Sequence, residues 1–374
     1  MSLEAWLATM VEKKGSDLFI MVGVPAMMKL DGQLQALNEE KLSAEQVQTV
    51  IFSMMSNEQR EQFIKNRELN FAVFREKLGR FRVSAFQQRS VLGAVLRRIE
   101  TVIPIVEELS LPKILNDFSL TQRGLIIFVG ATGSGKSSSL AAMIGYRNKN
   151  TRGHIISIED PIEFVHEHQG CIVTQREVGI DTESFDVALK NTLRQAPDVI
   201  LIGEIRTNET MTHAIAFAET GHLCLSTLHA NNANQALDRI ASFFPPEMHH
   251  QLWMDLSLNL KAIIAQQLIP TKDGTGRVPA VEILINTPVI AEHIRKGEVN
   301  VLKDFMAKSN ELGMQTFDQA LYKLYSEGKI SYESALKYAD SENEIRLLIK
   351  LSQGSAGIAS TEGLSIADDK PTEP

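Results

Sequence analysis

The first hundred residues alternate between helical and strand-like hydrophobic patterns. Leu3, Trp6, Leu7, Met10 and Val11 recur at the spacing of a helix that buries one face. Further helices are expected at 43–51 and 57–65, and strands at 18–22, 27–30, 33–37, 69–74, 80–88 and 91–99. An aspartate–glycine pair at 31–32 predicts a hairpin turn. Together these elements predict a small α+β domain over residues 1–103.

From residue 118 onward, apolar strand-like runs alternate with helical patterns. Strands are expected at 125–129, 154–158, 172–174, 199–202, 223–226 and 278–285. Helices are expected at 137–147, 184–195, 208–219 and 247–267, and they dominate from 289 to 349. This alternation predicts a mostly parallel sheet covered on both faces, in a second domain over 118–352. A linker over 104–117 contains Pro112, and the tail 353–374 lacks apolar periodicity and is expected to be disordered.

Composition narrows the class of protein. The 374 residues suffice for two domains, and the 44% hydrophobic content is that of an ordinary globular chain. No apolar run reaches the 18 residues of a membrane span and no signal peptide is seen, so we expect a cytoplasmic protein without direct membrane insertion. The net charge of −8 disfavours a nucleic-acid partner. Cys171 and Cys224 are expected to be small buried hydrophobes.

The strongest chemical signal follows the strand expected at 125–129. The pattern G-x-x-x-x-G-K-[S/T] of a phosphate-binding loop is formed there, and we expect the nucleotide to be held by Gly130, Ala131, Thr132, Gly133, Ser134, Gly135, Lys136, Ser137 and Ser138. The glycines let backbone N–H groups converge on phosphate, and the following helix adds the positive end of its dipole. Lys136 is expected to reach the β- and γ-phosphates, and the Ser137 hydroxyl to ligate Mg²⁺. A chance glycine-rich turn would lack the strand and helix around it.

Acidic residues end two of the later strands. Residues 155–163 place Glu159, Asp160 and Glu163 at the end of a strand, and 198–204 end in Glu204. Carboxylates at the ends of parallel strands lie where an α/β sheet binds its ligands, and the second pattern is that of a magnesium-side acid in phosphate-loop ATPases. Solvated surface charge is the alternative for both. A third strand is flanked by His222 and His229, which could hydrogen-bond a γ-phosphate or be ordinary surface histidines.

The order of these stretches resembles the secretion ATPase superfamily. The phosphate loop is followed by an acidic box at 159–163, a second acid strand at 198–204 and a histidine box at 221–229. The stretches 15–18, 160–166 and 312–318 are similar to the type IV pilus retraction ATPases of the PilT/PilU group, and the likeness covers about residues 1–350. The amino-acid sequence at 289–298 and the C-terminal extension at 336–351 look closer to the PilU branch of that group.

The resemblance implies a fold and roles for particular residues. It implies a RecA-like P-loop ATPase domain in the α/β class, with a smaller N-terminal α+β domain of PAS-like type, and ATP and Mg²⁺ as ligands. Glu163 would polarise the attacking water, Glu204 would support magnesium from its second coordination sphere, and His222 and His229 would be the histidine-box residues. Arg82 and Arg97 would reach phosphates from the N-terminal domain. Solvated charge on strand edges is the ordinary interpretation of these arginines.

The resemblance also implies a motor. Members form hexameric rings, so we expect a homohexamer that hydrolyses ATP to drive or assist pilus retraction in twitching motility, located at the pilus base next to the inner membrane. The expected partners are a PilT-like motor and the inner-membrane platform protein. The stretch 289–296 keeps only part of the A-I-R-N-L-I-R-E motif of the retraction motors, which favours an accessory role. The phenylalanine at position 19 stands where the family commonly has histidine.

Three alternatives stay open at this point. The chain could be a non-hydrolysing or weakly hydrolysing adaptor ring for another motor, although its acidic boxes are complete. It could be a type IV pilus assembly or type II secretion motor, although it lacks the four-cysteine zinc insert usual in those proteins. It could be a nucleic-acid translocase with a RecA-like core, which the acidic net charge opposes.

Overall fold

The computed structural model describes residues 2–30 and 32–357. The described chain forms two compact units. The first comprises the chain up to Glu108 together with Lys113–Ile127 and Lys136–Leu228. The second comprises Leu109–Pro112, Phe128–Gly135 and the described chain from His229 onward. Residues 130–135 of the phosphate loop therefore belong to the second unit, whereas Lys136, the lysine of the motif, belongs to the first.

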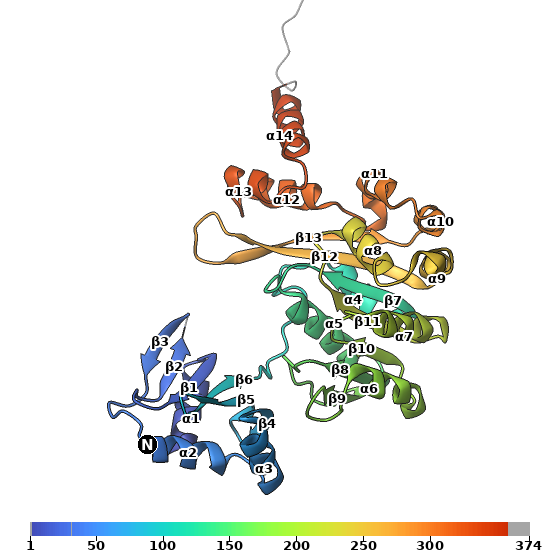
Figure 1. The fold of residues 1–374 in the computed structure, drawn as a ribbon. Helices are drawn as coiled ribbons and strands as arrows, with labels where there is room; N and C mark the ends of the chain where they lie inside the picture. The colour runs from blue at the N-terminus through green and yellow to red at the C-terminus, as the bar shows by residue number, and fades with distance from the viewer. Residues whose placement is uncertain (1, 31, 358–374) are drawn as a thin grey trace, which may run out of the picture. The chain divides into compact units, whose positions relative to one another are not determined.

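The N-terminal part of the first unit is a six-stranded sheet, drawn in blue to teal in Figure 1. Its strand order is β3-β2-β1-β6-β5-β4, and neighbouring strands pair antiparallel. The strands are β1 (Asp17–Met21), β2 (Met27–Leu30), β3 (Gln33–Ala36), β4 (Glu68–Arg75), β5 (Gly79–Gln88) and β6 (Val91–Arg98). All six strands predicted in this region are present.

Three helices bury their apolar faces against this sheet. They are α1 (Leu3–Glu12), α2 (Ala44–Ser53) and α3 (Asn57–Asn66). Ser43 and Ser56 begin α2 and α3 with capping boxes, in which the serine and a glutamine three residues later satisfy each other's backbone N–H groups. The shared core includes Trp6 of α1, Ile51 of α2 and Phe63 of α3, packed with buried strand residues such as Phe71 and Phe81. The helical spacing read from the sequence thus marks the buried faces.

The remainder of the first unit is built on parallel strands. These are β7 (Gly124–Val129), β8 (Gly153–Glu159), β9 (Cys171–Glu177), β10 (Val199–Ile202) and β11 (Leu223–Leu228), and they are neighbours in the order β7-β11-β10-β8-β9. The β8–β9, β8–β10 and β10–β11 pairs are parallel. Their helices are α4 (Ile114–Ser119), α5 (Lys136–Asn150), α6 (Phe185–Thr192) and α7 (Asn208–Glu219). Because β8 and β10 are parallel neighbours, the acids that follow them gather at one edge of the sheet.

The second unit contains a long antiparallel hairpin and most of the later helices. Strands β12 (Leu260–Pro270) and β13 (Arg277–Ile285) pair from Ala262 opposite Ile285 to Pro270 opposite Arg277, and they form the orange ribbon of Figure 1. The helices are α8 (Ala233–Ala241), α9 (His249–Asn259), α10 (Pro288–Lys296), α11 (Leu302–Ala307), α12 (Phe317–Ser326), α13 (Tyr332–Lys337) and α14 (Glu342–Gly357).

The predicted helix over 247–267 is wrong in its second half. The helix α9 ends at Asn259, and β12 takes over at Leu260. Residues 262–266 are all buried, which is typical of a strand covered on both faces and carries no period that separates it from a buried helix. Pairing with β13 therefore outweighed the helical propensity of this run. At the other end, α14 continues to Gly357, five residues past the predicted limit, and the rest of the predicted tail, 358–374, lies outside the described residues.

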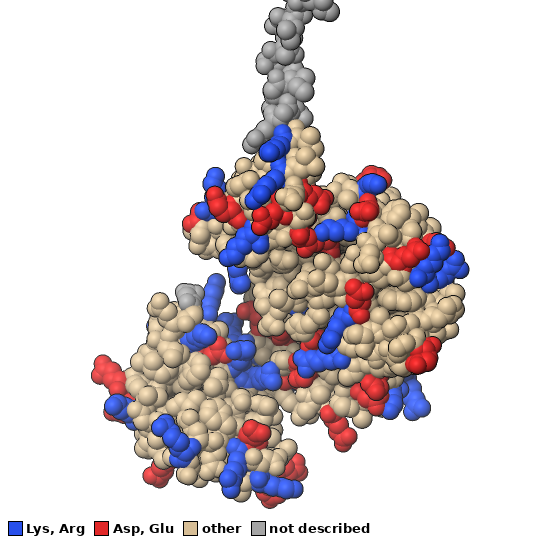
Figure 2. All heavy atoms as spheres, turned by 45° about the horizontal axis from the view of Figure 1, so that its top comes forward, with Lys and Arg blue, Asp and Glu red and all other residues tan. Residues whose placement is uncertain are grey.

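Figure 2 shows acidic and basic side chains interspersed over the face in view. Across the part of the chain that the structure describes, none of the helices combines the length and the apolar character needed to cross a bilayer.

Candidate functional site

The phosphate loop has the glycine geometry that close backbone approach requires. Gly130 has φ of +151°, and a Cβ added there would lie 2.5 Å from the Gln266 carbonyl oxygen. Gly135 has φ of +90°, and its Cβ would lie 2.7 Å from Nε2 of the same glutamine. The loop is therefore pressed against β12 at two glycines. Ser134 is buried with a hydroxyl that finds no hydrogen-bond partner, whereas residues 131–133 are exposed, so the loop presents a cradle suited to a phosphate group.

A hollow of about 380 Å³ in the second unit adjoins the start of this loop. It is lined by Gly130, Ala131, His229, Ala230, Asn231, Gln235 and Arg239. Of the predicted histidines, His229 is therefore brought next to the loop. Asn231, Gln235 and Arg239 were not among the predicted site residues. Asn231 lies just before α8, and Gln235 and Arg239 lie on it; their spacing of four residues, which places side chains on one face of a helix, is the signal that could have found them.

Lys136, Ser137 and Ser138 form the first turn of α5 in the first unit. Burial lowers the pKa of the Lys136 ammonium, and the carboxylates of Glu204 and Glu163 oppose this effect. The ammonium group is thus within electrostatic reach of both predicted acids, which follow the carboxyl ends of β10 and β8. The two carboxylates favour the charged form of the lysine, which is the form that binds a phosphate.

Glu204 is held by a neighbouring arginine. Its Oε2 accepts hydrogen bonds from Arg206 Nε at 2.8 Å and Nη2 at 2.6 Å, and this carboxylate raises the pKa of the guanidinium. The Ser137 hydroxyl and the Glu204 carboxylate are oxygen ligands of the kind that Mg²⁺ prefers. Among the described residues no cluster of three or more His, Cys, Asp or Glu side chains could hold a metal ion. A serine hydroxyl and a carboxylate fit a magnesium ion that takes its other ligands from phosphate and water.

The acidic box contains a carboxyl group that is protonated near neutrality. Burial raises the pKa of Glu159 to about 7, and the nearby carboxylates of Glu163 and Glu177 act in the same direction. Two hydrogen bonds to its Oε1 oppose the rise, one from Ser157 Oγ at 2.6 Å and one from Gln175 Nε2 at 3.2 Å. Glu177 and Gln175 lie on β9, where the sequence analysis expected only a short strand and assigned no chemistry.

Arginines of the N-terminal sheet face this acidic group. Arg80 Nη2 lies 3.9 Å from both Glu177 Oε2 and Asp181 Oδ2, and Arg80 and Arg82 oppose the rise in the pKa of the buried Glu177 carboxyl. Arg80 is half-buried. Arg97 is the cross-strand neighbour of Arg82, but its Nε donates to Asp17 Oδ1 at 2.8 Å and its side chain is 69% exposed.

The structure does not bring His222 to the predicted site. It precedes β11, and its Nδ1 lies 3.1 Å from Thr220 Oγ1, while its carbonyl accepts from the N–H of Gly124 at the start of β7. Glu163 and Glu204 follow the carboxyl ends of β8 and β10, whereas His222 precedes the amino end of β11. At about 3.3 Å per residue, a six-residue strand separates the two edges by roughly 20 Å. His222 and His229 thus flank β11 at its two ends, and the structure does not bring His222 next to Glu163 and Glu204.

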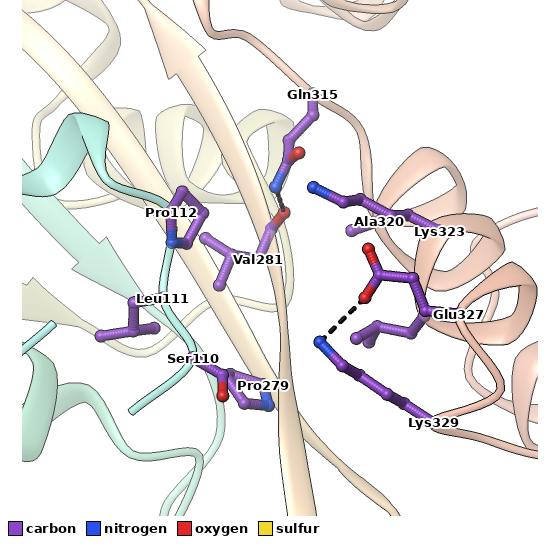
Figure 3. A pocket seen from close by; sticks show the side chains of 11 residues that line it. Ser110, Leu111, Pro112, Pro279, Val281, Gln315, Ala320, Lys323, Glu327 and Lys329 are labelled. Carbon is purple, nitrogen blue, oxygen red and sulfur yellow. Dashed lines mark hydrogen bonds and ion pairs between the residues drawn. The ribbon is translucent and has the colours of Figure 1, made fainter. Parts of the chain in front are cut away.

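A second hollow lies away from the predicted residues. It has a volume of about 170 Å³ and is lined by linker residues Ser110, Leu111 and Pro112 together with residues of β13 and α12 (Figure 3). Figure 3 shows Gln315 donating to the Val281 carbonyl, at 2.7 Å, and Lys329 paired with Glu327, at 2.8 Å. The hollow contains none of the predicted site residues.

The chain is similar to known proteins over nearly its whole length. The family model described as "Type II/IV secretion system protein" matches residues 3–324. The "Type IV pilus ATPase PilU" of Pseudomonas aeruginosa is 64% identical over 376 residues, which cover 99% of this chain and 98% of that protein. The "Type IV pilus retractation ATPase PilT" of the same organism is 41% identical over 339 residues, which cover 91% and 98%. These matches confirm the predicted resemblance.

A solved structure agrees with the fold. The crystal structure of the pilus retraction motor PilT with bound ADP superposes with a TM-score of 0.87 at 38% identity, covering 93% of this chain and 99% of that one. The match confirms the predicted α/β class with an N-terminal domain.

Proposed function

The chain belongs to the type II/IV secretion system protein family, and on that premise we propose that it is a P-loop ATPase that drives or assists the retraction of type IV pili. The observation that carries the proposal is the Lys136 ammonium at the start of α5, within electrostatic reach of Glu163 and Glu204. A cation at a helix N-terminus with acids nearby supports phosphoryl chemistry.

The proposed roles follow from the chemistry of each side chain. Backbone N–H groups of the loop and Lys136 bind the phosphates, and Glu163 orients a water molecule for attack on the γ-phosphate. Bound Mg²⁺ would supply neutralising charge, with Ser137 and Glu204 as the residues that hold it. His229 hydrogen-bonds the phosphate end of the nucleotide. Arg82 and Arg97 stabilise charge on the transferring phosphoryl group, a contribution of about 10³–10⁵ in rate for arginines in this role.

The finer parts of the proposal concern assembly and location. We propose a homohexamer that works at the cytoplasmic side of the inner membrane and contacts the pilus platform protein. A ring suits a motor because nucleotide turnover can change how rigid bodies contact one another. The named relatives are pilus ATPases, which supports a place at the pilus base.

Phosphate release by the purified full-length protein tests the catalytic claim. With Mg²⁺ and ATP we expect steady turnover in the wild type, little turnover in Lys136→Ala, and a loss of at least about 10²-fold in Glu163→Gln with nucleotide binding retained. The exposed Glu167→Gln, four residues further on, is the matched control and should turn over like the wild type. Equal turnover in the wild type and Lys136→Ala would refute the proposal.

A genetic experiment separates a motor from a helper. We propose an accessory role beside a PilT-like motor, because the 289–296 stretch departs from the motif of the retraction motors. In the structure this stretch forms α10, where Glu292 pairs with Arg295 and Lys296. Deleting this protein, the second motor, or both, and scoring pilus retraction, should show weaker retraction without this protein and none without the second motor. Full retraction by this protein alone would contradict the accessory role.

A further inference from the structure

The three residues directly after Glu163 each have a hydrogen-bonded backbone group. The carbonyl of Phe164 accepts from Gln175 Nε2 at 2.9 Å, and the N–H of His166 donates to Gln175 Oε1 at 2.8 Å. Between them, the N–H of Val165 donates to the carbonyl of Glu100 at 3.0 Å. The segment that carries Glu163 is thus held from two sides, by a side chain of β9 and by the backbone just after β6.

The Gln175 amide is fully used in this arrangement. Its Nε2 has two donors, and besides the Phe164 carbonyl it reaches Oε1 of Glu159 at 3.2 Å. Its Oε1 accepts from the His166 N–H, so the orientation of the amide follows from its partners. One half-buried side chain therefore ties the end of β8 to the residues one and three places after Glu163.

We propose that Gln175 is a positioning residue for Glu163, fixing the loop so that the Glu163 carboxylate is held where water is activated. The proposal rests on the proposed ATPase function and goes beyond it, because it assigns a role to a residue outside the predicted nucleotide-binding and catalytic set. The physical reason is that catalysis depends steeply on placement, and a displacement of about 1 Å can cost about 10²-fold in rate. Glu163 itself is exposed and lies outside the helices and strands, so the Gln175 amide and the Glu100 carbonyl supply the constraint on the residues that follow it.

A purely structural role for Gln175 makes a different prediction. If the amide only satisfied the backbone groups of a loop, its loss would lower stability and disturb nucleotide binding along with turnover. A residue that acts through Glu163 changes kcat while leaving KM and nucleotide affinity close to the wild-type values, and its effect disappears once Glu163 has lost its function.

The test uses full-length protein and four variants. Gln175→Met keeps the length of the side chain and removes every hydrogen bond, and we expect kcat to fall about 10- to 100-fold with KM and the Kd for a fluorescent ADP analogue changed by less than about threefold. In a Glu163→Gln background, adding Gln175→Met should cause no further loss. Gln251→Met is the matched control, since Gln251 is exposed and its side chain donates to Asp255 on the same helix, α9, and it should turn over like the wild type.

Each other outcome contradicts the proposal. Wild-type kcat in Gln175→Met, a parallel loss of nucleotide affinity, or an additional loss in the Glu163→Gln background would each overturn it. If Gln175→Met does not fold, Gln175→Asn, which is one methylene too short to reach both backbone groups, is measured in the same way. The ATPase proposal is judged separately, because its failure would appear as equal turnover in the wild type and Lys136→Ala, whatever Gln175 does.

Discussion

Replacing Glu159 by glutamine should stabilise the protein more at pH 8 than at pH 5. Burial raises the pKa of Glu159 from 4.5 to about 7. Below about pH 4.5 the folded and unfolded chains both carry the proton, so the group has no effect there. As the pH rises, the unfolded chain releases the proton first, and the folded state loses stability until about pH 7. At about 1.4 kcal/mol per pKa unit this loss is at most roughly 3 kcal/mol, reduced by the water that reaches the side chain.

Glutamine removes the charge and keeps a carbonyl that can accept from Ser157 and Gln175. Thermal unfolding of the wild type and Glu159→Gln at pH 5 and pH 8 should therefore give a difference in Tm that widens by a few degrees at pH 8. Glu282→Gln provides a second case, because burial also raises the pKa of Glu282 to about 7, in the second unit and with a hydrogen bond from the N–H of Ala233. A Tm difference that is the same at both pH values, or that narrows at pH 8, would refute the reasoning.

Two glycine substitutions give the remaining predictions. Gly130→Ala would place a Cβ 2.5 Å from the Gln266 carbonyl at φ of +151°, so we expect the loop to shift and affinity for a fluorescent ADP analogue to fall at least about tenfold; unchanged affinity would contradict this. Gly145→Ala would place a Cβ 2.7 Å from Ile103 Cγ2. The overpacking cost of about 1–3 kcal/mol should exceed the gain of about 1 kcal/mol in helix propensity, so we expect Tm to fall by up to a few degrees. A rise in Tm would count against this prediction.

Much of the local structure was predictable because it depends on residues close together in the chain. The phosphate loop needs only a strand, glycines and a helix start in sequence, and β7 and α5 flank it as expected. The capping serines and the hydrophobic faces of α1 to α3 are also local features. The prediction failed at β12, where a continuous buried run has no period and the pairing with β13, far along the chain, decided between helix and strand.

The candidate site divides in the same way. The sequence by itself predicted Lys136, Glu163 and Glu204 as site residues, the lysine from the phosphate-loop pattern and the glutamates from acids that follow apolar strands. Tertiary structure alone decided that Gln175 reaches the backbone after Glu163. The chemistry of a residue depends on its own side chain, whereas its hydrogen-bond partners depend on which strands are neighbours. The parallel pairing of β8 with β9 is a long-range contact that no local pattern encodes.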